Sequence, residues 1–195
     1  MGTALEYRTE AHLTDAQVDA LVDKLGGPEQ IRRILSGEIG LHLLPPAPAE
    51  RVVTVPGHLS FGERVRRGAY GWHNANLTEA RFPVTADQAG ATEQRLFHFD
   101  PGRSSEATLR EIRAVGYEPG RIGDLLAFGE HFPDEQRRYP VIGLGSVVPI
   151  DDSLNVPALW FDGDRRTLDL IFYDGDWHRN YRFLGVRRLV ARTED

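Results

Sequence analysis

The chain of 195 residues carries a formal net charge of −6 and has no cysteine. This length predicts one domain, with or without an N-terminal appendage, and the missing cysteines exclude disulfides, thiolate metal sites and thiol catalysis. There is no basic block to neutralise phosphates and no long apolar run, so we expect neither a nucleic-acid partner nor a membrane span. The N-terminus carries no export signal, which makes the cytoplasm the expected compartment.

Residues 14–38 predict a two-helix hairpin. Thr14 and Gln17 form a capping-box pattern, and apolar residues follow at helical spacing. Gly26-Gly27 ends the first helix, and Pro28 begins the second. A hairpin this short does not fold alone, so it packs on the rest of the chain, on a second copy of itself or on a partner. We favour the first of these only slightly, and oligomerisation through the hairpin stays open.

A proline-rich stretch at 44–48 predicts a stiff linker after the hairpin. It divides the chain into an N-terminal part, residues 1–48, and a main domain, residues 49–195. Residues 39–60 are expected to be loop-like as a whole. A short helix, interrupted by glycines, is predicted to begin at Phe61.

The middle of the chain alternates between strand and helix patterns. A strand is predicted over 92–99, a helix over 106–115 and a second helix over 119–128, ended by the glycine that follows it. A polar connector comes next. Residues 140–148 are continuously apolar rather than alternating, which predicts a buried strand.

Three strand-like runs end the chain, at 156–161, 167–173 and 181–189. Asp162-Gly163 and Asp174-Gly175 separate them, and Asp-Gly dipeptides favour tight hairpin turns. We therefore expect the three runs to form two consecutive antiparallel hairpins.

The middle run alternates cleanly between two sets of side chains. Leu168, Leu170 and Phe172 form one set; Thr167, Asp169, Ile171 and Tyr173 form the other. The first set is predicted to face the core and the second to face outward. An exposed isoleucine and tyrosine are unusual on a purely solvated face. Either this face is a contact surface or another element covers it, and the pattern leaves both readings open.

The order of elements, one strand, two helices and four strands, predicts an α+β fold with an antiparallel sheet. The first strand, near Phe97, is expected to pair with the last, near Phe183, which brings the ends of the main domain together. This layout resembles the C-type lectin fold, preceded here by the N-terminal helical hairpin.

Several short segments between residues 61 and 188 carry a family resemblance. They are 96–100 (LFHFD), 104–106 (SSE), 116–119 (GYEP), 124–129 (DLLAFG), 136–142 (QRRYPVI), 144–147 (LGSV), 176–177 (DW) and 181–187 (YRFLGVR). Together they resemble the variable, ligand-binding target proteins of bacterial diversity-generating retroelements. The match spans about two thirds of the chain. The closing segment, together with the tryptophan upstream of it, is its most specific part.

In that family a mutagenic reverse transcriptase randomises the adenines of a template, so that asparagine codons become codons that never encode Lys, Gln, Glu, Met or Trp. Residues 155–187 contain no Lys, Gln, Glu or Met, in agreement with the resemblance. Trp160 and Trp177 must come from other codons. The resemblance implies that Trp177 is a fixed core residue.

A scaffold tolerates random side chains only where they face solvent, and the resemblance therefore implies a variable, ligand-binding surface near the C-terminus. We expect it to comprise Asn155, Ala158, Trp160, Phe161, Thr167, Asp169, Ile171, Tyr173, His178, Arg179, Asn180 and Tyr181. Aromatic, Asn, His and Arg side chains are effective recognition groups. The alternative for 178–181 is an ordinary polar loop. The expected ligand is a protein or a carbohydrate, and no cofactor is expected.

Two other classes of function stay open. Formylglycine-generating enzymes share the fold that the resemblance implies, but their chemistry needs cysteines. A hydrolytic or metal site would have to draw on residues that show no tight ligand motif: His98, Asp100, His131, Asp174, Asp176 and His178. His73, beside a tryptophan, is expected to be packed rather than catalytic. Asp-rich turns at 162–164 and 174–176 could hold calcium, but turn formation by Asx side chains explains them better.

We therefore expect no catalytic residue and no metal ligand. The alternatives to a ligand-binding protein are a small hydrolytic or metal-dependent enzyme, and an assembly or adaptor protein that acts through residues 14–38.

Overall fold

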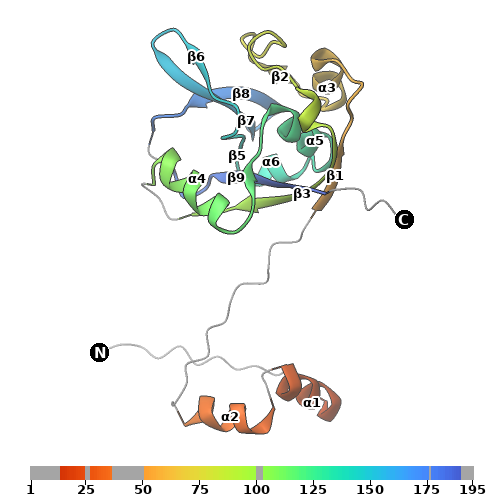
Figure 1. Ribbon diagram of the computed structural model, residues 1–195, viewed down its shortest axis with the longest axis vertical. Coiled ribbons are helices and arrows are strands. Elements are labelled where there is room, and N and C mark those ends of the chain that lie inside the picture. The colour runs from red at the N-terminus through yellow and green to blue at the C-terminus, as the bar shows by residue number, and fades with distance from the viewer. Residues whose placement is uncertain (1–13, 25–26, 37–50, 100–102, 176, 190–195) are drawn as a thin grey trace. The chain divides into compact units, whose positions relative to one another are not determined.

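The computed structural model describes residues 14–24, 27–36, 51–99, 103–175 and 177–189 (Figure 1). The chain divides into two compact units, Met1–Pro46 and Ala47–Asp195. The proline-rich linker that was predicted between them lies outside the described residues. Each unit is therefore considered by itself.

The first unit contains the predicted helical hairpin, with α1 at Asp15–Lys24 and α2 at Pro28–Leu35. The backbone N–H of Gly27 donates to the carbonyl of Val22 and closes the break between the helices. The side chain of Gln17, half of the predicted capping box, lies outside the described residues. No residue of α2 is buried within the unit, and Leu35 is 80% exposed.

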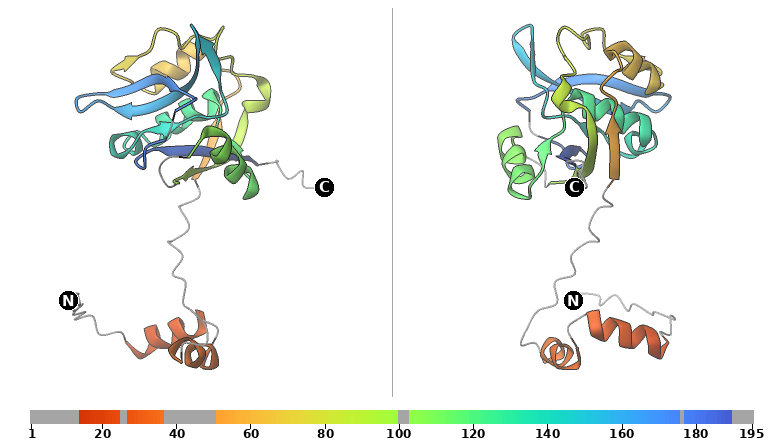
Figure 2. Two further views of the ribbon diagram at one scale, coloured as in Figure 1. Left: turned by 90° about the vertical axis from the view of Figure 1, so that its left-hand side faces the viewer. Right: turned by 45° about the vertical axis from the view of Figure 1, so that its right-hand side comes forward.

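The second unit is built on one nine-stranded sheet with the strand order β1-β3-β9-β5-β7-β8-β2 (Figures 1 and 2). Its strands are β1 (Arg51–Val55), β2 (Trp72–His73), β3 (Gly90–Phe97), β4 (Glu118–Pro119), β5 (Val141–Ile142), β6 (Val148–Ile150), β7 (Ser153–Phe161), β8 (Arg166–Phe172) and β9 (Arg182–Arg188). Off the main order, β4 pairs with β9, and β6 pairs with β7. The β6–β7 hairpin projects from the unit at the upper left of Figure 1.

Helices pack on both faces of this sheet. They are α3 (Phe61–Arg67), the 3₁₀ helix η1 (Ala86–Gln88), α4 (Ser105–Ala114), α5 (Ile122–His131) and α6 (Glu135–Arg138). Ser104 caps α4 by accepting a hydrogen bond from the N–H of Ala107. The α+β class predicted from the order of elements is confirmed, but the sheet is mixed rather than antiparallel, because β2 pairs with β8 and β5 with β9 in parallel.

Successive residues of the central strands point to opposite faces of the sheet and into different cores. Leu159, Leu168 and Leu184 pack with α5, on the side we call the α5 face. Phe183 and its strand partner Phe97 pack with α4, on the side we call the α4 face. Both faces of the sheet centre are therefore covered.

The predicted pairing of the first and last strands is confirmed. β3 and β9 run antiparallel, with Thr92 opposite Arg188 and Phe97 opposite Phe183. The Asp162-Gly163 hairpin is also present between β7 and β8. Its Asp162 carboxylate accepts hydrogen bonds from the N–H groups of Asp164 and Arg165, and Gly163 adopts φ 95°.

The second predicted hairpin is wrong. β8 and β9 are not neighbours, because β7 and β5 lie between them in the sheet. The turn at residues 173 and 174 therefore begins a crossover connection rather than a hairpin between neighbouring strands. The local dipeptide signal is the same at both positions, and the long-range pairing of β9 with β3 and β5 decides the outcome.

Three other expectations are corrected by the structure. Residues 51–55 form β1 rather than loop, and the strand expected over 140–148 is split into β5 and β6. The second helix begins at Ile122, since Pro119 belongs to β4. That helix also continues beyond Gly129 to His131. Gly129 is needed there for close packing, because a Cβ on it would lie 2.2 Å from the hydroxyl oxygen of Tyr70.

Candidate recognition surface

The register of β7 and β8 determines which predicted site residues share a face. The cross-strand pairs Val156–Ile171, Ala158–Asp169 and Trp160–Thr167 lie on the α4 face. Asn155 and Phe161 lie on the opposite, α5 face, so they are not part of the same surface. The guanidinium of Arg137 lies 4.8 Å from the centre of the Phe161 ring.

The predicted inner set of β8 is only partly correct. Leu168 is fully buried and Leu170 packs against the same core, as expected. Phe172, predicted to face the core, is 67% exposed. It lies at the end of β8, where it alternates onto the α5 face beyond the extent of the core there.

Three predicted binding residues are buried, so the prediction that they are exposed is wrong. Ala158 belongs to the core on the α4 face, opposite Ile142 of β5. The hydroxyl of Thr167 donates to the carbonyl of Trp160, and the side-chain amide of Asn155 donates to the carbonyl of Ser153. The alternation of a single strand assigns each position to a face but does not show whether that position is covered.

Ile171 and Tyr173 are half-buried and pack against the core on the α4 face, so they are less exposed than predicted. Ser105, the first residue of α4, fixes this end of β8. Its hydroxyl donates to the carbonyl of Tyr173 at 2.6 Å and accepts from the indole nitrogen of Trp177 at 3.1 Å. Desolvation, followed by the charge of Glu106, raises the pKa of the Tyr173 phenol, which therefore stays neutral.

The loop between Trp177 and β9 presents three exposed side chains, His178, Arg179 and Asn180. Trp177 anchors one end, with its ring packed edge-on against Tyr181 and Phe183 at centroid distances of 5.6 and 5.3 Å.

The backbone of this loop is held by its neighbours. The N–H of Tyr181 donates to the carbonyl of His178 at 3.0 Å. The carbonyl of Arg179 lies 2.6 Å from Nε2 of His98 and 3.3 Å from Nη1 of Arg182. The loop is thus a defined turn with outward-pointing side chains.

An aromatic row crosses the sheet on the α4 face beside this loop. Trp72 of β2 is opposite Thr167, which is opposite Trp160 of β7. Val141 of β5 is opposite Leu159 of β7 and Arg182 of β9, so the preceding residue, Pro140, lies between Trp160 and Tyr181 in the same register. The N–H of Arg182 donates to the carbonyl of Pro140.

Sequence reasoning missed Trp72, because a two-residue strand leaves no alternation to detect. Trp72 is 40% exposed and Trp160 is half-buried. The indole nitrogen of Trp160 is buried, without a hydrogen-bond partner among the described residues. Asn74, the residue after β2, donates a hydrogen bond from its side-chain amide to the carboxylate of Asp169 in β8 at 2.9 Å.

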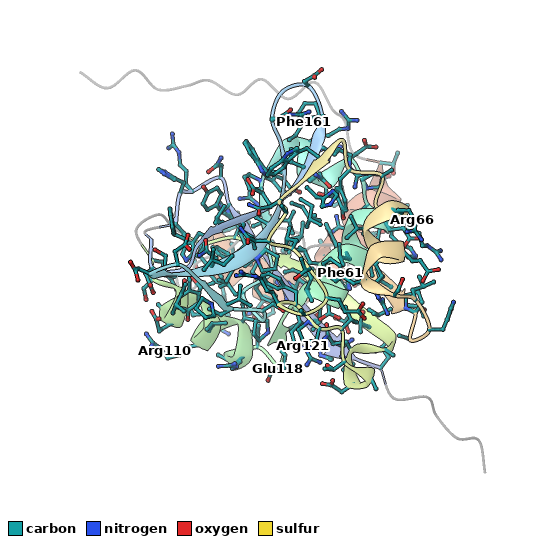
Figure 3. All side chains as sticks on the ribbon, turned by 90° about the horizontal axis from the view of Figure 1, so that it is seen from above. Phe61, Arg66, Arg110, Glu118, Arg121 and Phe161 are labelled. Atoms are coloured by element: carbon teal, nitrogen blue, oxygen red, sulfur yellow. The ribbon has the colours of Figure 1, made fainter. Side chains whose placement is uncertain are left out.

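We define the recognition surface as the accessible residues on and beside this row. It comprises Trp72, Trp160, Asp169, Ile171, Tyr173, His178, Arg179, Asn180 and Tyr181. Figure 3 shows Phe161 at the β7–β8 hairpin, well separated from Arg110, Glu118 and Arg121 on the other side of the unit. Glu118 and Arg121 line a second feature, a groove considered below, whereas Arg110 does not.

The structure describes four of the six residues weighed for a hydrolytic or metal site: His98, His131, Asp174 and His178. Ring nitrogens of His98 and His131 each lie within hydrogen-bond distance of a backbone carbonyl. Asp100 and Asp176 lie outside the described residues. Across the ranges that the structure describes, no group of three or more His, Asp or Glu side chains is placed to hold a metal ion. In the same ranges, no helix combines the length and the apolar character needed to cross a bilayer.

Comparisons of the chain with protein-family models, with curated proteins and with solved structures give no match. The family resemblance and its implied C-type lectin-like fold therefore stay predictions that rest on the sequence motifs.

Proposed function

We propose that the protein is a non-catalytic ligand-binding protein that recognises a protein or carbohydrate through the recognition surface, within a C-type lectin-like fold. The observation that carries the proposal is the way the exposed turn at 178–180 is held. Trp177 and Ser105 anchor it on one side, and His98 and Arg182 on the other. A turn fixed in this way loses little conformational entropy when it binds a partner.

The composition of the surface supports the same proposal. Trp72, Trp160, Tyr173 and Tyr181 offer rigid aromatic area, and Arg179 offers a planar cationic group. Tryptophan, tyrosine and arginine are the residue types that dominate binding energy at protein interfaces. Rings with few rotatable bonds also lose little entropy on contact.

We further propose that part of this surface is diversified by retroelement-directed mutagenesis, as the family resemblance implies. Burial restricts where diversification is tolerated. His178, Arg179 and Asn180 are exposed, whereas Ala158 and Thr167 are packed in the core and are expected to be constrained. Trp72 and Trp160 would form a fixed aromatic part of the surface beside the variable turn.

Two matched libraries test this proposal. In the first, codons 178–180 are replaced by NNY; in the second, codons 155, 158 and 167 are. We expect most members of the first library to resist proteolysis and few of the second, because surface substitutions usually change stability by less than about 0.5 kcal/mol, whereas core substitutions cost several. Equal loss of folded protein from both libraries would contradict the proposed division.

Binding and genetics provide the other half of the test. Selection of the first library against a panel of proteins and glycans should yield binders that lose affinity when Trp160 is replaced by Ala. The neighbouring DNA should contain a near-copy of codons 155–187 that differs only at adenines. Binders that are indifferent to Trp160 would remove the aromatic row from the proposal, and a neighbourhood without such a repeat would remove diversification.

A further inference from the structure

A groove of about 870 Å³ is lined by none of the residues that define the recognition surface. Its walls are the last turns of α4, the segment 116–121, the loop 144–147 and the end of β9. The volume falls in the range of small-molecule sites, roughly 300–1,000 Å³. Nothing in the proposed function uses it.

The walls of the groove are fixed by backbone hydrogen bonds. The N–H of Gly120 donates to the carbonyl of Leu184 at 2.7 Å, and the N–H of Gly145 donates to the carbonyl of Gly120 at 2.9 Å. The loop approaches so closely that a Cβ on Gly145 would lie 2.4 Å from the carbonyl oxygen of Pro119. The groove is therefore preformed and does not depend on a ligand for its shape.

Its lining combines an apolar surface with an excess of positive charge. Leu109, Leu144, Val147 and Val186 supply the apolar part. Four arginines and two carboxylates also line the groove, in a chain whose net charge is −6. Two of the arginines form ion pairs with buried carboxylates: Arg187 with Glu93 and Arg188 with Asp124.

The other two arginines keep free hydrogen-bonding capacity. Arg113 pairs with Glu118 through Nε alone at 3.2 Å, and Arg121 pairs with Asp87 through one terminal nitrogen at 2.6 Å. Because a guanidinium carries five N–H donors, most donors of both arginines have no acceptor among the described residues. The side chains of Arg113 and Arg121 are 54% and 32% exposed, so their donors are accessible.

The start of α5, which also lies beside the groove, is not available to an anion. Its first N–H groups are already bonded within the protein: that of Ile122 to the hydroxyl of Ser146 at 2.9 Å, and that of Gly123 to the side chain of Gln88 at 3.0 Å. Recognition of negative charge in the groove therefore falls to the guanidinium groups.

We propose that this groove binds an organic monoanion, a carboxylate carried on an aliphatic body. Arg113 and Arg121 take the carboxylate, and Leu109 and Val147 pack against the body. A monoanion fits better than a phosphate dianion, because Asp87 and Glu118 on the same rim repel additional negative charge. The carboxylate belongs either to a free acid or to the C-terminus of a peptide, which share this chemistry.

The test is a titration of the full chain followed by amide chemical shifts. Hexanoate is the probe; hexanamide has the same body without the charge, and acetate has the charge without the body. We expect saturable shifts at the amides of Gly116, Gly145 and Val147 with hexanoate, and binding at least about tenfold weaker with either control. Equal binding of hexanoate and hexanamide, or no saturable shift at these amides, would overturn the proposal.

Two variants with the same change in charge sharpen the result. Arg113→Gln removes a proposed ligand, whereas Arg110→Gln changes an exposed arginine on the same helix that does not line the groove. We expect the first to weaken hexanoate binding by roughly tenfold or more, and the second by less than about twofold. Equal weakening would mean that net charge alone attracts the probe, which contradicts a site.

The source of the carboxylate is resolved by a second pair of probes, acetyl-Leu-Leu with a free C-terminus and the same peptide as its amide. Binding of the acid peptide more tightly than hexanoate would assign the groove to a peptide terminus, and the reverse order to a free acid. Because the groove lining and the randomised residues 178–180 have no residue in common, failure of one experiment leaves the other result standing.

Discussion

Trp177 links the core of the second unit to its candidate binding surface. The side chain is 4% exposed, its ring contacts Tyr181 and Phe183, and its indole nitrogen donates to Ser105. The hydroxyl of Ser105 in turn donates to the carbonyl of Tyr173. One buried residue thus holds both the end of β8 and the beginning of the exposed turn.

Replacement of Trp177 by Ala should lower the free energy of unfolding by about 3–5 kcal/mol, the usual loss for a large buried aromatic side chain. The same substitution at Trp72, which is 40% exposed, should cost less than about 1 kcal/mol. Urea denaturation of the two variants measures the difference. Similar losses at both positions would show that burial does not distinguish them.

Ser105→Ala removes a bridge rather than a core side chain. The variant leaves the carbonyl of Tyr173 and the indole N–H of Trp177 without this partner, at an expected cost of about 1–3 kcal/mol. Chemical shifts of residues 178–180 should move, because their anchor is altered. Ser104→Ala is the control: it removes only the α4 cap, at a typical cost of about 1 kcal/mol, and should leave those shifts in place.

The ion pair between Asp87 and Arg121 makes the stability of the protein depend on pH in the acidic range. Hydrogen bonds from Thr85 and then from Arg121 lower the pKa of Asp87 from 3.8 to about 2. Because the folded-state pKa lies below the unfolded one, the stabilisation is present above the unfolded pKa and is lost as pH falls toward about 2. In Asp87→Asn, urea midpoints should fall less steeply between pH of about 4 and about 2. An identical pH profile would contradict this.

At the scale of elements, local sequence patterns predict where the helices lie. They predict less well which strands lie next to each other in the sheet. The β7–β8 hairpin follows from its turn, and the predicted pairing of the strands at Phe97 and Phe183 is confirmed in β3 and β9. The placement of β5 and β7 between β8 and β9 has no local signal. β2 and β5, with two residues each, are too short to show a period.

Burial at the candidate site shows the same limit. The alternation of residues in β8 assigns them correctly to the two faces of the sheet. It does not predict which elements cover each face. Thr167 is buried and Phe172 is exposed. The sequence of β8 does not predict this difference, because the elements that cover a strand come from distant parts of the chain. The exposed turn at 178–180 was predictable from its polar composition. The groove was not, because its walls come together only through the pairing of β4 with β9.

Gly129 and Tyr70 form a testable contact between α5 and the segment after α3. A Cβ on Gly129 would lie 2.2 Å from the Tyr70 hydroxyl, so Gly129→Ala should cost about 1–3 kcal/mol. That hydroxyl is buried without a partner among the described residues, so Tyr70→Phe alone should be nearly neutral.

The double variant should recover part of the loss, although a contact with Leu159 at 2.9 Å remains. Denaturant unfolding of the four proteins gives the coupling energy. Strictly additive effects would show that the hydroxyl does not limit the space at Gly129.

At the scale of the whole molecule, the buried core found among the described residues belongs to the second unit. The three clusters formed by these residues lie between Val53 and Val186. A chain that begins at Ala47 should therefore unfold within about 2 °C of the full chain in a thermal scan.

A chain that begins at Gly57 is the control. It lacks β1, whose Val53 and Val55 are buried against α5, and should be clearly less stable. A large loss already in the chain from Ala47 would mean that the first unit supports the second.

The central position of β9 has a consequence for synthesis. β9 is the last of the described strands to be made, yet it lies between β3 and β5 and pairs with β3 across about ninety residues of chain. A ribosome-bound chain cannot complete this sheet before residues 182–188 emerge. We therefore expect folding to wait until translation has passed through the entire segment 155–181. A stop codon or frameshift within that segment would remove β9 and leave an unfolded product open to proteolysis, so that only fully translated versions of the surface persist.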